Sequence, residues 1–153
     1  MSDSATQIAN LVGRYAEYID AGDFEGVAAL LADAAVGSGD AGSGDSSAAL
    51  TGHQQVLRLY ESTTRRYEDG TPRTKHMTTN LIIEVDEAAG TATARSYWMV
   101  FQAVPGLPLQ PILAGRYHDT FDRAPGTWRF TGRRFLVDLV GDLRHHLLTE
   151  LPS

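Results

Sequence analysis

Apolar residues recur at helical spacing near the start of the chain. Between Thr6 and Asp20 they follow the i, i+3, i+4, i+7 pattern of one buried stripe: Ile8, Leu11, Val12, Tyr15 and Ile19. The sequence therefore predicts a helix over this range, and Gly22 is well placed to end it. Asp20 would then stand at the negative end of the helix dipole, where a cation is preferred. This position tends to raise the pKa of the carboxyl group.

Two shorter helices are expected after the first. Asp23 is a typical N-cap for a helix that ends near Asp33, and a third helix is expected over 52–67. Between them, residues 37–47 are almost entirely glycine, serine, alanine and aspartate, which predicts a loop or a flap over a pocket. The loop contains a G-x-G-x-x-G spacing, but no βαβ unit follows it, so a dinucleotide site is not indicated.

From residue 74 onward the pattern changes to the period of two that is typical of strands. Four strands are predicted, joined by turns and by a proline-rich loop over 105–111: Thr74–Asp86, Thr91–Val104, Ile112–Arg123 and Thr127–Leu139. Helices followed by consecutive strands indicate an α+β fold in a single domain, residues 1–153. Strands this long in a small domain indicate a strongly curved, mostly antiparallel sheet.

The first predicted strand has one polar and one apolar face. Alternation places four residues on one side: His76, Thr78, Asn80 and Ile82. The other side is apolar apart from one threonine: Met77, Thr79, Leu81, Ile83 and Val85. A polar row on such a strand is either a solvated surface or the wall of a pocket.

The second predicted strand, Thr91–Val104, carries large apolar side chains on both faces. Three short helices cannot cover both sides of a sheet. We therefore expect the outer face to form a homo-oligomer, and the sequence leaves dimer and trimer open.

Composition excludes several classes of protein. The chain has 13 basic and 19 acidic residues and a net charge of −6, which argues against nucleic-acid binding. No apolar run approaches the roughly 18 residues that span a bilayer, and the N-terminus does not resemble a signal peptide. We therefore expect a cytoplasmic protein without membrane contact. The chain has no cysteine, which rules out thiol chemistry.

A metal site is not expected. No H-E-x-x-H motif occurs, and the adjacent His145 and His146 would point about 100° apart on a helix. No cofactor is expected either.

Four stretches together resemble the SnoaL-like branch of the nuclear transport factor superfamily. They are Tyr15 to Phe24, the run 30–36, His76 with Asn80 four residues later, and Gly126 to Phe130 before the closing strand. The resemblance covers roughly residues 6–140. It implies a cone of three N-terminal helices packed on the curved sheet, an apolar pocket between them and an oligomer formed through the sheet.

Within this superfamily the chain is most similar to the group of scytalone dehydratase and hexachlorocyclohexane dehydrochlorinase. Those enzymes pair an acid at the end of the first helix with a histidine on the first long strand, and Asp20 and His76 stand at these places. A neutral imidazole is a suitable base for proton abstraction near pH 7. A carboxylate on its other nitrogen would fix the tautomer. The alternative is a structural contact between the two side chains.

The same resemblance suggests further residues for substrate contact. Tyr15 would donate a hydrogen bond to a developing oxyanion, or belong to the core. Asn80 would bind substrate beside His76, or satisfy the backbone of a neighbouring strand. Arg133 stands where the dehydrochlorinase has an arginine that holds the leaving anion, or it faces solvent.

Two more candidates mark departures from the dehydratase. Gln102 stands where that enzyme has a second catalytic histidine, and Tyr117 stands where it has an asparagine. These differences argue against a reaction that uses the dehydratase's water-binding residues. Both residues remain candidates for substrate contact.

Two functions fit these observations. The first is a cofactor-free lyase or isomerase of dehydratase, dehydrohalogenase or cyclase type, in which His76 and Asp20 abstract a proton from a small, largely apolar cyclic molecule. The second is a non-catalytic binding domain or accessory subunit, similar to the β-subunits of ring-hydroxylating dioxygenases.

Overall fold

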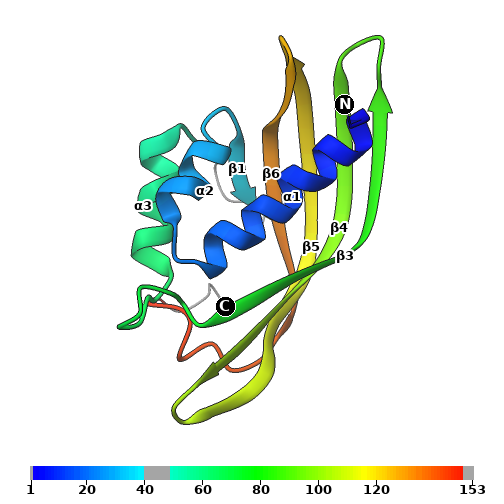
Figure 1. Cartoon of the computed structure of the whole chain (residues 1–153). Coiled ribbons are helices and arrows are strands. Elements are labelled where there is room, and N and C mark those ends of the chain that lie inside the picture. The colour runs from blue at the N-terminus through cyan, green and yellow to red at the C-terminus, as the bar shows by residue number, and fades with distance from the viewer. Residues whose placement is uncertain (1, 40–48, 150–153) are drawn as a thin grey trace.

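The computed structural model describes residues 2–39 and 49–149 as three helices packed on one six-stranded sheet (Figure 1). The elements in chain order are α1 (Ser4–Asp20), α2 (Phe24–Leu30), β1 (Ala35–Ser38), β2 (Leu50–Thr51), α3 (His53–Thr63), β3 (Thr74–Asp86), β4 (Thr91–Val104), β5 (Leu107–Ala124) and β6 (Thr127–Val140). The strand order is β2-β1-β6-β5-β4-β3, and only the β1–β6 pair is parallel. The predicted α+β architecture with a curved, mostly antiparallel sheet is confirmed.

Helix α1 lies across the concave face of the sheet and ends where the sequence predicts (Figure 1). Asp3 caps its N-terminus by accepting a hydrogen bond from the Thr6 backbone N–H at 2.8 Å. At the other end Gly22 has a φ of 72°, and a Cβ atom there would lie 1.9 Å from the Gly70 carbonyl oxygen. The positive φ and this close contact both exclude a side chain at position 22. The requirement for glycine fixes the end of α1 directly after Asp20.

Four predicted boundaries are wrong. Helix α2 ends at Leu30 rather than near Asp33. Helix α3 ends at Thr63 because Thr64 is extended and pairs with Leu147 of the C-terminal segment. Strand β5 begins at Leu107, inside the predicted proline-rich loop, because its first residues already pair with β4. The predicted loop 37–47 begins inside β1, and its residues 40–47 lie outside the described part of the chain.

Strand β3 is bent by a β-bulge between Thr79 and Ile82, and Figure 1 shows the strand turning midway along its length. Asn80 lies in the bulge with a φ of 54°, a conformation that asparagine tolerates better than most residues. The extra residue reverses the alternation, so that Leu81 rather than Asn80 continues the inward face that carries His76. The prediction that Asn80 shares this face is therefore wrong, and its side chain is exposed.

A cluster of aromatic side chains lies within the core between the helices and the sheet. Tyr117 stacks on Trp98 with ring centroids 5.6 Å apart, and its edge meets Tyr15 and Phe135. This packing depends on Gly115, where a Cβ atom would lie 2.7 Å from the Trp98 ring and 2.0 Å from the Leu136 carbonyl oxygen. The glycine lets the β5 backbone pass close to both groups.

A buried ion pair lies within this aromatic cluster. Arg133 on β6 donates to both carboxylate oxygens of Asp119 on β5, at 2.8 and 2.9 Å, and both side chains are fully buried. The guanidinium also lies 3.7 Å from the centre of the Tyr117 ring. Burial alone would lower the pKa of Arg133, but the carboxylate of Asp119 outweighs it and the pKa is raised. Arg133 therefore stays charged inside the fold.

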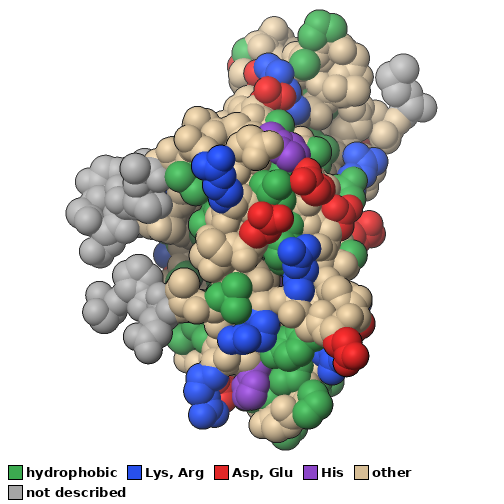
Figure 2. Space-filling model, turned by 90° about the vertical axis from the view of Figure 1, so that its left-hand side faces the viewer, with side chains coloured by type: hydrophobic (Ala, Val, Ile, Leu, Met, Phe, Trp, Pro, Cys, Tyr) green, Lys and Arg blue, Asp and Glu red, His purple; other side chains and the backbone are tan. Residues whose placement is uncertain are grey.

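The two faces of the molecule differ in character. Figure 2 shows acidic and basic side chains interspersed over the helical face. The opposite face, which we call the outer sheet face, exposes the following large apolar side chains: Met77 at 50%, Tyr97 at 55%, Met99 at 38% and Leu139 at 70%. They border a groove of about 580 Å³. In the described part of the chain, no helix is long and apolar enough to cross a membrane.

The buried ion pair gives a stability prediction. Asp119→Ala leaves the Arg133 charge buried without its partner, so we expect a loss of about 3–5 kcal/mol in the free energy of unfolding, measured with urea. The exposed pair of Asp122 and Arg129, 2.7 Å apart, is the matched control. Asp122→Ala should cost less than about 1 kcal/mol. Equal losses in the two variants would contradict this account of the core.

Candidate active site

The candidate site lies where the end of α1 meets the start of β3. The Asp20 carboxylate accepts three hydrogen bonds there, all from residues of β3. Its Oδ2 accepts the His76 backbone N–H at 2.8 Å. Its Oδ1 accepts the Thr74 hydroxyl at 2.9 Å and lies 2.7 Å from Nδ1 of His76. Asp20 thus contacts both the backbone and the ring of His76.

The Asp20 carboxylate is ionised at neutral pH. Burial would raise the pKa of Asp20, but the hydrogen bonds from His76 and Thr74 and the charge of His76 outweigh burial, so the pKa lies below its ordinary value. The rise expected from the helix dipole alone is therefore wrong. An ionised carboxylate only accepts hydrogen bonds, so Nδ1 of His76 carries the proton between them. In the neutral ring Nε2 is then the basic nitrogen.

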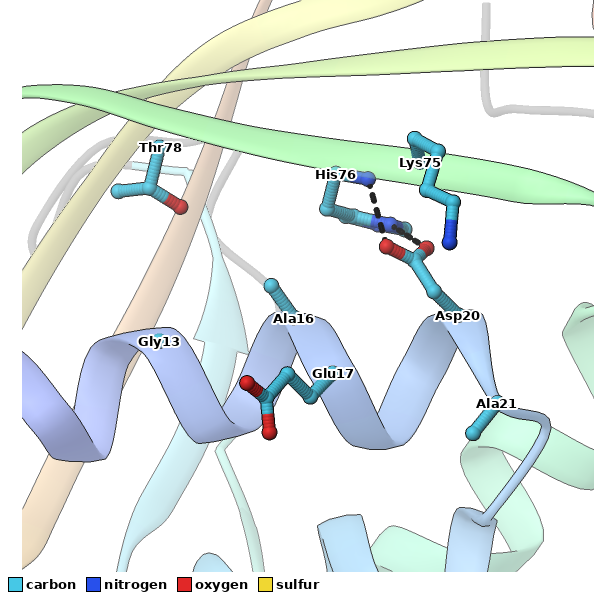
Figure 3. Close-up of a pocket in the computed structure, with 8 residues that line it drawn as sticks. All are labelled: Gly13, Ala16, Glu17, Asp20, Ala21, Lys75, His76 and Thr78. Atoms are coloured by element: carbon cyan, nitrogen blue, oxygen red, sulfur yellow. Dashed lines mark hydrogen bonds and ion pairs between the residues drawn. The ribbon is translucent and has the colours of Figure 1, made fainter.

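The dyad opens onto a depression of about 500 Å³ between α1 and β3. Figure 3 shows Asp20 reaching from the last turn of α1 towards His76, with Lys75 beside them and Glu17 one turn earlier on the helix. Gly13 and Ala16 line the helix side of the depression, and Thr78 lines the strand side. The His76 and Asp20 side chains are only 9% and 10% exposed, so the depression reaches the dyad without leaving it fully solvated.

Tyr15 and Tyr117 lie inward from the dyad. The Tyr15 hydroxyl is 2.6 Å from that of Tyr60, and its ring meets the His76 ring edge-on at a centroid distance of 6.5 Å. Burial raises the pKa of Tyr15 and of Tyr117 well above their ordinary values, so both phenols stay neutral. Tyr15 is therefore at once a core residue and a neighbour of the dyad.

Arg133 does not face solvent, so that alternative from the sequence is wrong. Its guanidinium lies 4.3 Å from the centre of the Tyr15 ring and is held by Asp119. One guanidinium nitrogen, Nη1, is buried with no hydrogen-bond partner among the described residues. Arg133 thus combines a neutralised charge with one free donor behind the tyrosines.

Gln102 is buried on β4 and connects two other segments. Its side-chain amide donates to the Pro72 carbonyl at 3.1 Å and to the His145 carbonyl at 3.0 Å. On the neighbouring strand its register partner is Thr74, which binds Asp20. Gln102 therefore holds the C-terminal segment against the strand that carries the dyad.

The sequence analysis places Thr78 on the face of His76 without giving it a role in the site, and it does not name Thr74 or His146 as site residues. Strand alternation alone also places Thr74 on that face. His146 was considered only as a metal ligand. It is buried near the dyad because the segment 142–149 folds back under α3 in turns, and no local pattern predicts that return.

No three His, Asp or Glu side chains gather as a metal site requires within residues 2–39 and 49–149. The groups available at the dyad are an ionised carboxylate, a basic imidazole nitrogen and neutral hydroxyls. Together they can bind and transfer a proton.

Three helices packed on a curved, mostly antiparallel sheet form the cone-shaped α+β fold of the nuclear transport factor type. The chain belongs to the SnoaL-like domain family, whose model matches residues 1–134. No curated protein matches the sequence.

Solved structures share the fold at low sequence identity. A putative scytalone dehydratase from Novosphingobium aromaticivorans has a TM-score of 0.66 at 22% identity, covering 90% of this chain and 86% of the other. LinA has a TM-score of 0.68 at 20% identity, covering 98% of this chain and 95% of LinA. The β-subunit of a putative aromatic-ring-hydroxylating dioxygenase from N. aromaticivorans has a TM-score of 0.67 at 20% identity, covering 88% of this chain and 89% of the subunit. At these identities the likeness concerns the fold.

Proposed function

We propose that the protein is a cofactor-free lyase or isomerase that removes a proton from a carbon of a small, largely apolar cyclic substrate. The observation that carries this proposal is the 2.7 Å contact between Asp20 Oδ1 and His76 Nδ1, which leaves Nε2 as the base. The similar fold of a putative scytalone dehydratase supports the same class.

The proposed step uses few groups. Nε2 of His76 takes the proton, and the C–H electron pair forms a new double bond. In an elimination the leaving group departs with the electron pair of its bond to carbon. In an isomerisation an existing double bond shifts, and the proton returns at another carbon. Asp20 stabilises the imidazolium that forms. Tyr15, Tyr117 and Arg133 are proposed as the polar and aromatic wall of the substrate site, and Gln102 as a positioning residue.

A second candidate is a binding domain or accessory subunit. The observation in its favour is that Asp20 also bonds the backbone N–H of His76 and the hydroxyl of Thr74, so the dyad ties α1 to β3 without any chemistry. The fold likeness to a dioxygenase β-subunit is compatible with this role. Activity measurements separate the two candidates, because a purely structural dyad gives no proton transfer.

The test is proton exchange at carbon. The full chain is incubated in D₂O with 2-tetralone, a largely apolar cyclic ketone with an acidic C–H, and deuterium uptake is followed by NMR. We expect exchange above the solvent background, lowered by on the order of 10²–10⁴-fold in His76→Gln. We expect Asp20→Asn to lower it by about tenfold or more, because the tautomer is no longer fixed.

His118→Gln is the control for this test, because His118 is exposed and lies on β5 away from the dyad. It should exchange at the wild-type rate. Exchange that persists in His76→Gln would show that another group is the base. No exchange with this probe or with related cyclic ketones and halogenated rings would favour the binding-domain candidate.

We also propose that the protein is a cytoplasmic homo-oligomer that associates through the outer sheet face. The support is the exposed apolar set of Met77, Tyr97, Met99 and Leu139 around one groove, since such patches commonly mark interfaces. Light scattering should give a dimer or trimer for the wild type and a smaller species for Tyr97→Glu. Leu109→Glu, at a residue 74% exposed outside this groove, is the control. A monomeric wild type would contradict the proposal.

A further inference from the structure

A second imidazole is buried near the dyad. His146 belongs to the C-terminal segment 142–149 and is 6% exposed. Its Nδ1 has no hydrogen-bond partner among the described residues. Folded proteins seldom leave a buried polar atom unpaired, and those that remain commonly serve a bound water, a ligand or a reaction. His146 therefore has a hydrogen-bonding group that the fold itself does not use.

The backbone around His146 is firmly held. Its carbonyl accepts the Arg65 backbone N–H at 2.8 Å, and the Leu148 N–H donates to the Thr63 carbonyl at 2.9 Å. These bonds flank the bridge between Thr64 and Leu147, so the segment runs antiparallel to the chain that leaves α3. In Figure 1 it is the red stretch below α3. The position of His146 is thus set by backbone pairing.

The same segment is linked to the dyad through β4 and β3. The carbonyl oxygen of His145 accepts a hydrogen bond from the Gln102 side-chain amide at 3.0 Å. Gln102 is the register partner of Thr74, and Thr74 donates to Asp20 at 2.9 Å. A short path of hydrogen bonds and strand pairing therefore joins the segment to the carboxylate that orients His76.

The electrostatics agree with this proximity. The pKa of His146 is lowered to about 4, mainly by burial and also by the charge of His76, while the carboxylate of Asp20 opposes both effects. Because His76 and Asp20 both affect its pKa, the His146 ring lies close enough to interact electrostatically with both residues. At neutral pH His146 is an uncharged imidazole, with one N–H donor and one acceptor nitrogen.

We propose that His146 is a catalytic residue that binds the oxygen of a cyclic ketone substrate whose acidic C–H faces His76. This inference rests on the proposed function and narrows its substrate class. When Nε2 of His76 takes the proton, the C–H electron pair forms a carbon–carbon double bond and the carbonyl π pair moves onto the oxygen. The N–H of the neutral His146 ring donates to that oxyanion, and the proton held by His76 later returns to carbon.

A ketone fits this pair better than a halogenated ring without oxygen. A neutral imidazole donates one hydrogen bond and carries no charge, so it suits an oxygen that becomes negative during the reaction. The fixed charge of Arg133, by contrast, is already bound by Asp119. His146 is therefore a neutral donor near the dyad, whereas Arg133 is a cation whose charge is balanced by Asp119.

The test measures binding and turnover on the full chain with 2-tetralone. With ¹⁵N-histidine labelling, saturating 2-tetralone should shift the ring nitrogen signals of His146 in the wild type. In the exchange assay, His146→Phe should lower kcat by about 10–100-fold with a smaller change in KM. His146→Gln keeps a donor and should recover part of the loss. His118→Gln should match the wild type in both readouts.

Each outcome decides the proposal. Wild-type kcat in both His146 variants overturns it, and so do ring signals of His146 that do not move with 2-tetralone. If neither variant folds, the wild-type ring signals give the answer alone. If the wild type binds 2-tetralone and shifts His146 but does not exchange, the proposed function fails while His146 stands as a ligand-binding residue.

Discussion

The carboxylate of Asp20 is the interaction on which the candidate site depends. Asp20 is the last residue of α1 and lies at the negative end of the helix dipole, where an acid is unfavourable. Three hydrogen bonds from β3 offset this cost and hold the helix end against the strand. Gly22 makes the position possible, because a side chain there would collide with Gly70. The same contacts that join helix to sheet therefore also orient the imidazole.

The core behind the dyad is both polar and tightly packed. Tyr15 connects the two regions, since its ring meets His76 on one side and the Arg133 guanidinium on the other. The buried pair of Arg133 and Asp119 keeps its charges balanced. A reaction at the dyad would thus take place against a wall of neutral phenols and one neutralised cation. Such a wall changes little in charge as a proton moves, which suits the proposed proton transfer.

Much of the fold follows from the sequence, while parts of the site do not. The stripe on α1 and the alternation in the strands predict the elements and the place of Asp20 and His76. Asn80 was misplaced because a bulge reverses the alternation, and nothing in a single sequence marks the extra residue. The sequence leaves the burial of Arg133 undecided, because burying its charge requires Asp119, which lies 14 residues away. His146 was missed because long-range pairing of the C-terminal segment positions it.

In the proposed mechanism, Asp20 fixes the tautomer of His76 so that Nε2 is the base. The most direct measurement is the ¹H–¹⁵N correlation pattern of the His76 ring at neutral pH, in the wild type and in Asp20→Ala. We predict a neutral ring protonated on Nδ1 in the wild type and a mixture of tautomers in the variant. A ring protonated on Nε2 in the wild type, or the same pattern in both proteins, would contradict the account.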